Sequence, residues 1–220
     1  MTEDTRHVAG PDARDNEPRL SAAALRDWSA IVESVMRGVA HDLNNRAVAL
    51  SAIIELSRDP VADDAAAVQS ILSQELARVT ELGRVMRTIG QPRATVEAFA
   101  PADVAQETAV IVALHPAHRE RSAVIDASRA SPVRLVRWMF VRALIALATN
   151  GESPKNAVPR LVIADEDDWV VARREDVTMP AVQLSPYATE LARAMGGDPL
   201  VEAAGFRVPS LAALRRREGR

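Results

Sequence analysis

Two long amphipathic segments in the first half of the chain constrain the fold most strongly. Between residues 20 and 57 there is no proline, and Gly38 is the only glycine. Apolar residues recur there at helical spacings of three and four. The pattern predicts one helix over residues 20–57, with Ser21 as its N-cap. A second helix is expected from about residue 64 to Ile89, which carries the same kind of apolar stripe.

The length of the first helix indicates how these segments pack. About 38 residues at ~1.5 Å per residue give a helix of ~57 Å, which is longer than a small domain is wide. The two helices are expected to form an antiparallel hairpin, but one hairpin cannot cover two stripes of this length. We therefore expect two hairpins to pair into a four-helix bundle, which makes the protein a homodimer.

Beyond residue 92 the pattern changes to short elements of mixed type. Helices are expected over 101–114, over 132–149 behind a Ser131-Pro132 start, over 186–195 and after a Ser210 cap. Strands are expected over 122–127, 160–164, 169–173, 200–203 and 206–208, with an acidic turn at 165–168 and a helix stop at Gly196-Gly197. The expected organisation is a disordered tail over 1–19, a helical hairpin over 20–92 and an α/β sandwich over 93–220. The fold class is therefore α+β.

Composition excludes several classes of function. The chain has no cysteine, which rules out a disulfide scaffold, a cysteine zinc site and a cysteine nucleophile. A net charge of -3 gives no general reason to bind nucleic acid. No segment approaches the ~20 apolar residues of a membrane helix, so we expect a cytoplasmic protein without membrane or nucleic-acid partners. His115 and His118 are the best metal-ligand pair, but no third ligand lies near them in sequence and we expect no metal.

Polar residues interrupt the apolar seam in the middle of the first helix. His41 and Asn45 are four residues apart and share a face, with Asn44 beside them. An exposed imidazole on a rigid helix is a nucleophile that another protein can approach. The neighbouring carboxylate of Asp42 can accept a proton from one ring nitrogen and leave the other free to attack.

A structural explanation competes with the catalytic one. A lone histidine on a helix is usually an ordinary surface residue. However, two asparagines in mid-helix are neutral to unfavourable by propensity, and helix stability does not require them. Conflicts of this kind are typical of functional sites.

The segment GVAHDLNN, residues 38–45, resembles the H-box of sensor histidine kinases, which lies on the first helix of a dimerisation and phosphotransfer hairpin. The resemblance implies that His41 is a phosphoacceptor and that Asp42 orients or deprotonates its imidazole. Asn45 matches the position that holds a water for dephosphorylation of a response regulator. The implied partners are receiver domains, which carry their own Mg²⁺ and dock around Asn44 and Arg46.

The second half is similar to the ATP-binding domain of that family, with its nucleotide site eroded. Asn150 matches a metal-ligating asparagine, although it is also simply the end of a helix. The glycine-rich adenine box expected between residues 173 and 185 is missing, and the segment is too short for an ATP lid. The resemblance thus implies a histidine phosphotransferase that binds no cofactor and is not an ATP-dependent autokinase. A response-regulator phosphatase and a non-enzymatic binding protein are the alternatives.

Overall fold

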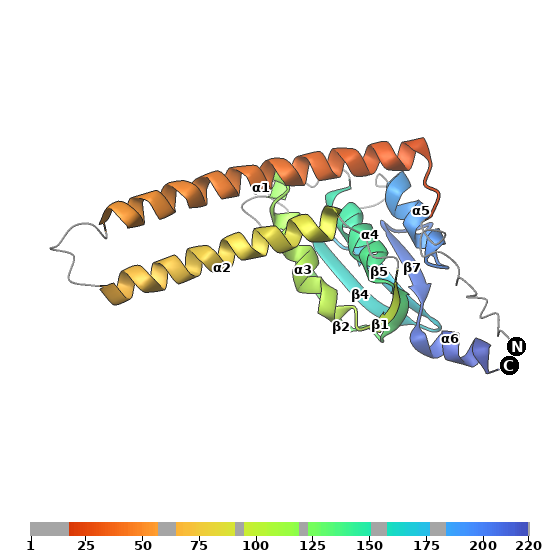
Figure 1. The fold of residues 1–220 in the computed structure, drawn as a ribbon. Helices are drawn as coiled ribbons and strands as arrows, with labels where there is room; N and C mark the ends of the chain where they lie inside the picture. Colours follow the sequence, from red (N-terminus) through yellow and green to blue (C-terminus); the bar gives the residue numbers. More distant parts are fainter. Residues whose placement is uncertain are drawn as a thin grey trace, which may run out of the picture.

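The computed structural model describes residues 18–56, 65–90, 95–118, 123–150, 158–176 and 184–219. Two long helices, α1 (Ala22–Leu56) and α2 (Ala65–Gly90), lie side by side as a hairpin, and one end of the hairpin extends beyond the rest of the molecule (Figure 1). The two helices predicted from periodicity are therefore confirmed, with each boundary within two residues. The predicted tail over 1–19 lies outside the described residues except for its last two.

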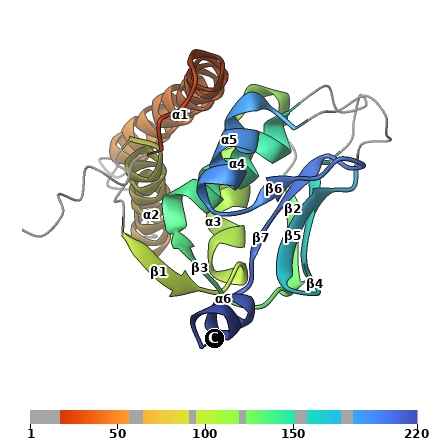
Figure 2. The same cartoon turned by 90° about the vertical axis from the view of Figure 1, so that its right-hand side faces the viewer.

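The rest of the described chain forms a two-layer α/β domain, so the predicted α+β class is confirmed. Three helices lie on the face of the main sheet that is turned toward the hairpin (Figure 2). They are α3 (Ala102–Ala113), α4 (Arg137–Thr149) and α5 (Pro186–Ala194). A short 3₁₀ turn, η2 (Pro116–His118), follows α3, and α6 (Leu211–Glu218) ends the described chain.

The main sheet has five strands in the order β2-β4-β5-β7-β6. The β2–β4 pair is parallel and the other three pairs are antiparallel. The strands are β2 (Val124–Arg129), β4 (Arg160–Glu166), β5 (Trp169–Arg174), β6 (Asp198–Pro199) and β7 (Gly205–Pro209). The predicted acidic turn joins β4 to β5, and Asp167 has a φ of 55° there. Asp is one of the few residues that tolerate this left-handed conformation.

Helix α4 forms the centre of the core. Every residue from Met139 to Ala148 is buried, and all of them except Arg142 are apolar, which fits a helix that is covered on both sides. Phe140 makes edge-on contacts with Phe99 and with Phe206 of β7, with ring centroids 5.8 and 5.9 Å apart. The sheet and the hairpin therefore share one hydrophobic core through α4.

The predicted helix start at Ser131-Pro132 is wrong. The structure instead forms strand β3 (Val133–Val136), which pairs antiparallel with β1 (Val96–Phe99), and α4 begins only at Arg137. Valine-rich segments favour strands when a partner is available, and the pairing buries Val133. Ser131 precedes a strand and therefore does not cap a helix; its backbone N–H and hydroxyl instead donate to the Asp165 carboxylate.

The expected strand over 200–203 is also wrong. Residues 201–204 form bends, and the strand lies earlier, at Asp198–Pro199. Gly197 allows this placement because a Cβ there would lie 1.8 Å from the carbonyl oxygen of Arg207 on the neighbouring strand. The remaining predicted elements appear with boundaries shifted by a few residues. Ser21, Ser185 and Ser210 accept hydrogen bonds from backbone N–H groups as helix caps, and Gly196 has a φ of 75° at the end of α5.

Helices α1 and α5 each supply a carboxylate that caps the first turn of the other. The N–H and hydroxyl of Ser21 donate to the Glu190 carboxylate of α5 at 2.7 and 2.5 Å. In return, Asp27 of α1 accepts a hydrogen bond from the backbone N–H of Tyr187 at 3.3 Å. Carboxylates near helix N-termini are favourable because they satisfy N–H groups that have no partner within the helix. These contacts tie the start of the hairpin to the domain.

An aromatic stack reinforces this junction. The Trp28 ring of α1 stacks on Tyr187 at 4.7 Å between centroids. The Arg142 guanidinium lies over the rings of both Trp28 and Trp138, at 4.9 and 4.6 Å, and donates a hydrogen bond to the carbonyl of Ile89 at the end of α2. Arg142 therefore joins both helices of the hairpin to α4.

Candidate functional site

His41 lies in the middle of α1 and is exposed to solvent, as are Asn44 and Asn45. At ~100° per residue, His41 is turned about 160° away from Val39. Val35 and Val39 are almost fully buried against the rest of the molecule. The structure thus brings His41, Asn44 and Asn45 together on one outward face of the helix, where another protein can reach the imidazole.

Asp42 lies about a quarter-turn from His41 and is half-buried. It lines a cavity of about 430 Å³ between α1, α2 and α3, whose walls include Arg78, Glu81 and Val110. Within the described residues, Asp42 makes no hydrogen bond or ion pair with His41, because neighbours in a helix do not face each other. The predicted role of Asp42 in orienting the imidazole stays a prediction.

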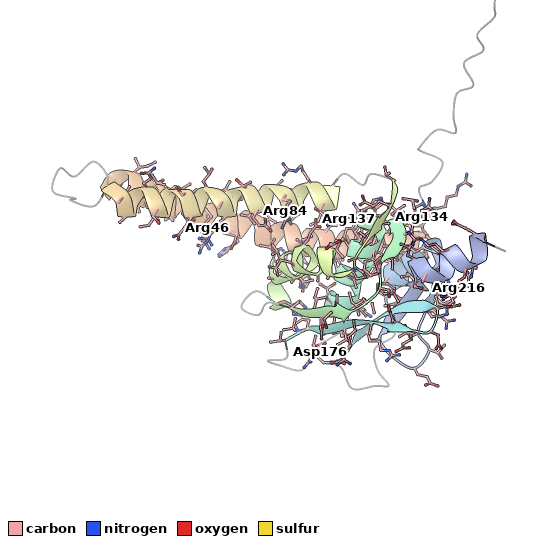
Figure 3. The ribbon with its side chains drawn as sticks, turned by 90° about the horizontal axis from the view of Figure 1, so that it is seen from below. Arg46, Arg84, Arg134, Arg137, Asp176 and Arg216 are labelled. Atoms are coloured by element: carbon pink, nitrogen blue, oxygen red, sulfur yellow. The ribbon has the colours of Figure 1, made fainter. Side chains whose placement is uncertain are left out.

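Arg46 is engaged within the hairpin (Figure 3). Its guanidinium contacts the Glu75 carboxylate of α2 at 3.1 Å, and Arg78 contacts the same carboxylate at 3.3 Å. The Glu75 side chain is only 9% exposed, so this ion pair holds α1 and α2 together. A partner that binds the Arg46 guanidinium would have to compete with Glu75 for it. The predicted role of Arg46 in partner binding stays a prediction.

Arg37 is a charged residue on the His41 face that the sequence reasoning missed. It forms an ion pair with Glu33 at 2.9 Å, and both side chains are more than two-thirds exposed. Arg37 and Glu33 lie one and two turns before His41. Their spacing of four residues in the sequence is the signal that could have found them.

A buried ion pair lies at the end of β5, at the start of the segment that lacks the expected adenine box. The Arg174 guanidinium donates to the Asp176 carboxylate at 2.9 and 2.8 Å and to the carbonyl of Asn150. Burial disfavours the charged form of Asp176, but hydrogen bonds from Arg174 and from the backbone N–H of Arg160 outweigh it and lower the pKa of Asp176. Residues 177–183 lie outside the described residues.

His115 and His118 lie just beyond α3, with His118 in η2, and their ring centroids are 5.5 Å apart. Burial lowers the pKa of His115, and His118 is buried. The described residues contain no group of three or more His, Asp or Glu side chains that could hold a metal ion. Among the described helices, none combines the length and hydropathy that crossing a bilayer requires.

Comparison with known proteins gives only distant likenesses. No family model matches the chain, and no curated protein matches it. The solved structure of the histidine kinase AdeS from Acinetobacter baumannii is similar over 78% of this chain and 98% of that one, with 14% identity and a TM-score of 0.41. A histidine kinase from Burkholderia phymatum STM815 is similar over 87% of this chain and 98% of that one, with 13% identity and a TM-score of 0.39. Likeness at this level assigns neither a family nor a function to the chain.

Proposed function

We propose that the protein is a histidine phosphotransfer protein that relays a phosphoryl group between receiver-domain aspartates through His41. In the first step, an imidazole nitrogen of His41 attacks the phosphorus of an aspartyl phosphate. A P–N bond forms, the acyl P–O bond breaks and the receiver aspartate leaves as a carboxylate. In the second step, the aspartate of another receiver attacks the phosphohistidine and reverses these bond changes.

The observation that carries this proposal is that His41 is exposed on a helix whose position is fixed by contacts on both sides of it in the sequence. C-terminal to His41, the Arg46–Glu75 ion pair joins α1 to α2. N-terminal to His41, Trp28 and Gly38 contact the α/β domain. Phosphoryl transfer asks mainly for alignment and charge compensation. A rigid helix supplies the alignment, and each receiver brings its own Mg²⁺ for the charge.

Exposed apolar side chains support the proposed homodimer. Large hydrophobic residues lie 43–66% exposed along the two helices, on positions that neither the hairpin nor the domain covers. They are Leu25, Val48, Ile54, Ile71, Leu76 and Met86. Val48 lies seven residues after His41 and shares its outward face, whereas a second hairpin would bury the other five in a four-helix bundle. Leu76→Glu should lower the mass measured by light scattering to that of a monomer, whereas Val201→Glu, at an exposed valine of the domain, should leave the mass unchanged.

Receiver domains labelled beforehand with ³²P separate the proposed function from its alternatives. Label that moves to this chain and is lost in His41→Ala supports phosphotransfer. Release of free phosphate that depends on Asn45 would instead indicate a phosphatase, and stable binding without either reaction would indicate a binding protein. His115→Gln is the matched control, because it removes a histidine outside this face and should keep full transfer. Label from ATP alone would show an autokinase and contradict the proposal.

A further inference from the structure

We propose, on the basis of the phosphotransfer function above, that Arg37 binds the phosphoryl group on His41 and that Glu33 holds Arg37 while His41 is unmodified. The phosphoryl group would then have a cation supplied by its own helix. This assignment goes beyond the H-box positions His41, Asp42 and Asn45.

The direction of helical side chains places these groups together. Cα–Cβ bonds of an α-helix tilt toward its N-terminus, so a side chain covers the turn before its own position. The His41 imidazole therefore leans over the turn that carries Arg37, and residues four apart have Cβ atoms only about 5–6 Å apart. Both side chains are exposed, so neither has to leave a packed position for this contact to form.

Local charge makes Arg37 the available partner. A phosphoryl group carries a charge of about −1.5 to −2 near neutral pH. Between Arg37 and Asn45 the chain has no other cation, and Asp42 adds a negative charge. Arg46 is the next arginine, but it is held by the Glu75 carboxylate on the inner side of the hairpin.

The pair with Glu33 is of the kind that exchanges easily. Both partners are more than two-thirds exposed, and such surface ion pairs are weak. A phosphoryl group offers more charge than a carboxylate and accepts two hydrogen bonds from the planar guanidinium. Phosphorylation of His41 should therefore draw Arg37 away from Glu33.

Direct chemical phosphorylation tests this contact without any receiver. Potassium phosphoramidate transfers its phosphoryl group to histidine: the P–N bond of the reagent breaks, ammonia leaves and a P–N bond to the imidazole forms. The titration of the phosphohistidine is then followed by ³¹P NMR in the full chain. Arg37→Gln should raise the pKa of the phosphoryl group by about 0.3–0.7 unit, because the cation that favours the dianion is gone.

Three further variants make the result specific. Glu33→Gln should lower that pKa, because it frees Arg37 and removes a negative charge. Arg37→Lys should restore part of the wild-type value. Arg26→Gln removes an exposed arginine about three turns further from His41 and should leave the titration unchanged. High salt should shrink the Arg37→Gln difference, because exposed charges are screened.

The outcomes separate the two proposals. If His41 takes the label but Arg37→Gln titrates like the wild type, or if Arg26→Gln shifts the pKa equally, the Arg37 assignment is wrong and the phosphotransfer proposal stands. If phosphoramidate labels other histidines and leaves His41 unmodified, the phosphotransfer proposal fails and the Arg37 assignment fails with it.

Discussion

Two glycines in the hairpin should respond in opposite directions to the same substitution. A Cβ at Gly83 in α2 would meet no atom within 4 Å, so Gly83→Ala should raise the free energy of unfolding by about 1 kcal/mol through helix propensity. A Cβ at Gly38 in α1 would lie 1.8 Å from the carbonyl oxygen of Leu114, which is backbone and cannot rotate away. Gly38→Ala should gain the same propensity and still lose about 1–3 kcal/mol overall, because α1 must shift away from the end of α3.

Chemical denaturation of the two variants, read beside the wild type, gives the difference directly. The expected gap between Gly83→Ala and Gly38→Ala is about 2–4 kcal/mol. Receiver transfer should fall in Gly38→Ala and not in Gly83→Ala, because Gly38 lies one turn before His41. A Gly38→Ala protein that is as stable as Gly83→Ala would refute the close contact between α1 and the domain.

Three other perturbations address the junctions of the hairpin. Arg46→Ala should reduce the free energy of unfolding by about 1–3 kcal/mol, because Arg46 is mostly buried and its ion pair with Glu75 joins the two helices. Arg78→Ala should reduce it by less than about 1 kcal/mol, because Arg78 is half-exposed and lies on the same helix as Glu75; equal effects of the two variants in urea denaturation would contradict this. Burial lowers the pKa of His115 from its ordinary value of 6.5, so its contribution to the free energy of unfolding is complete above about pH 6.5 and is lost as the pH falls through the lowered pKa. His115→Gln should therefore flatten the curve of unfolding free energy against pH below about pH 6.5, and an unchanged curve would refute this reasoning. Trp28→Ala should destabilise by about 2 kcal/mol and speed hydrogen exchange in the first turns of α1, and unchanged exchange there would count against the stack.

Local signals in the sequence were sufficient where one short segment determines the structure. Ser185 and Ser210 stand directly before apolar helical runs, and each does cap its helix. Gly196 ends α5 in a conformation that few other residues adopt. The exposed position of His41 also follows from its phase relative to the apolar stripe of α1.

Features that depend on distant segments could not be predicted from the sequence. Residues 133–136 form a strand because residues 96–99 lie beside them, and nothing within either segment specifies that pairing. Gly38 has an ordinary helical setting, and only the carbonyl of Leu114 explains why no side chain fits there. The partner of Arg46 lies 29 residues away on the second helix, beyond the reach of helical spacing rules.

The mutual caps between α1 and α5, which are far apart in the sequence, have a consequence for synthesis on the ribosome. Glu190, which accepts the hydrogen bonds of Ser21, is translated 169 residues after it. Tyr187, which donates to Asp27, is translated 160 residues after Asp27. At about 5–20 residues per second, roughly 10–30 s pass between the emergence of the first partner and the second. During that interval the start of α1 lacks its final cap and its aromatic neighbour. We therefore expect the nascent hairpin to acquire protease resistance at its first turns only after α5 has been translated.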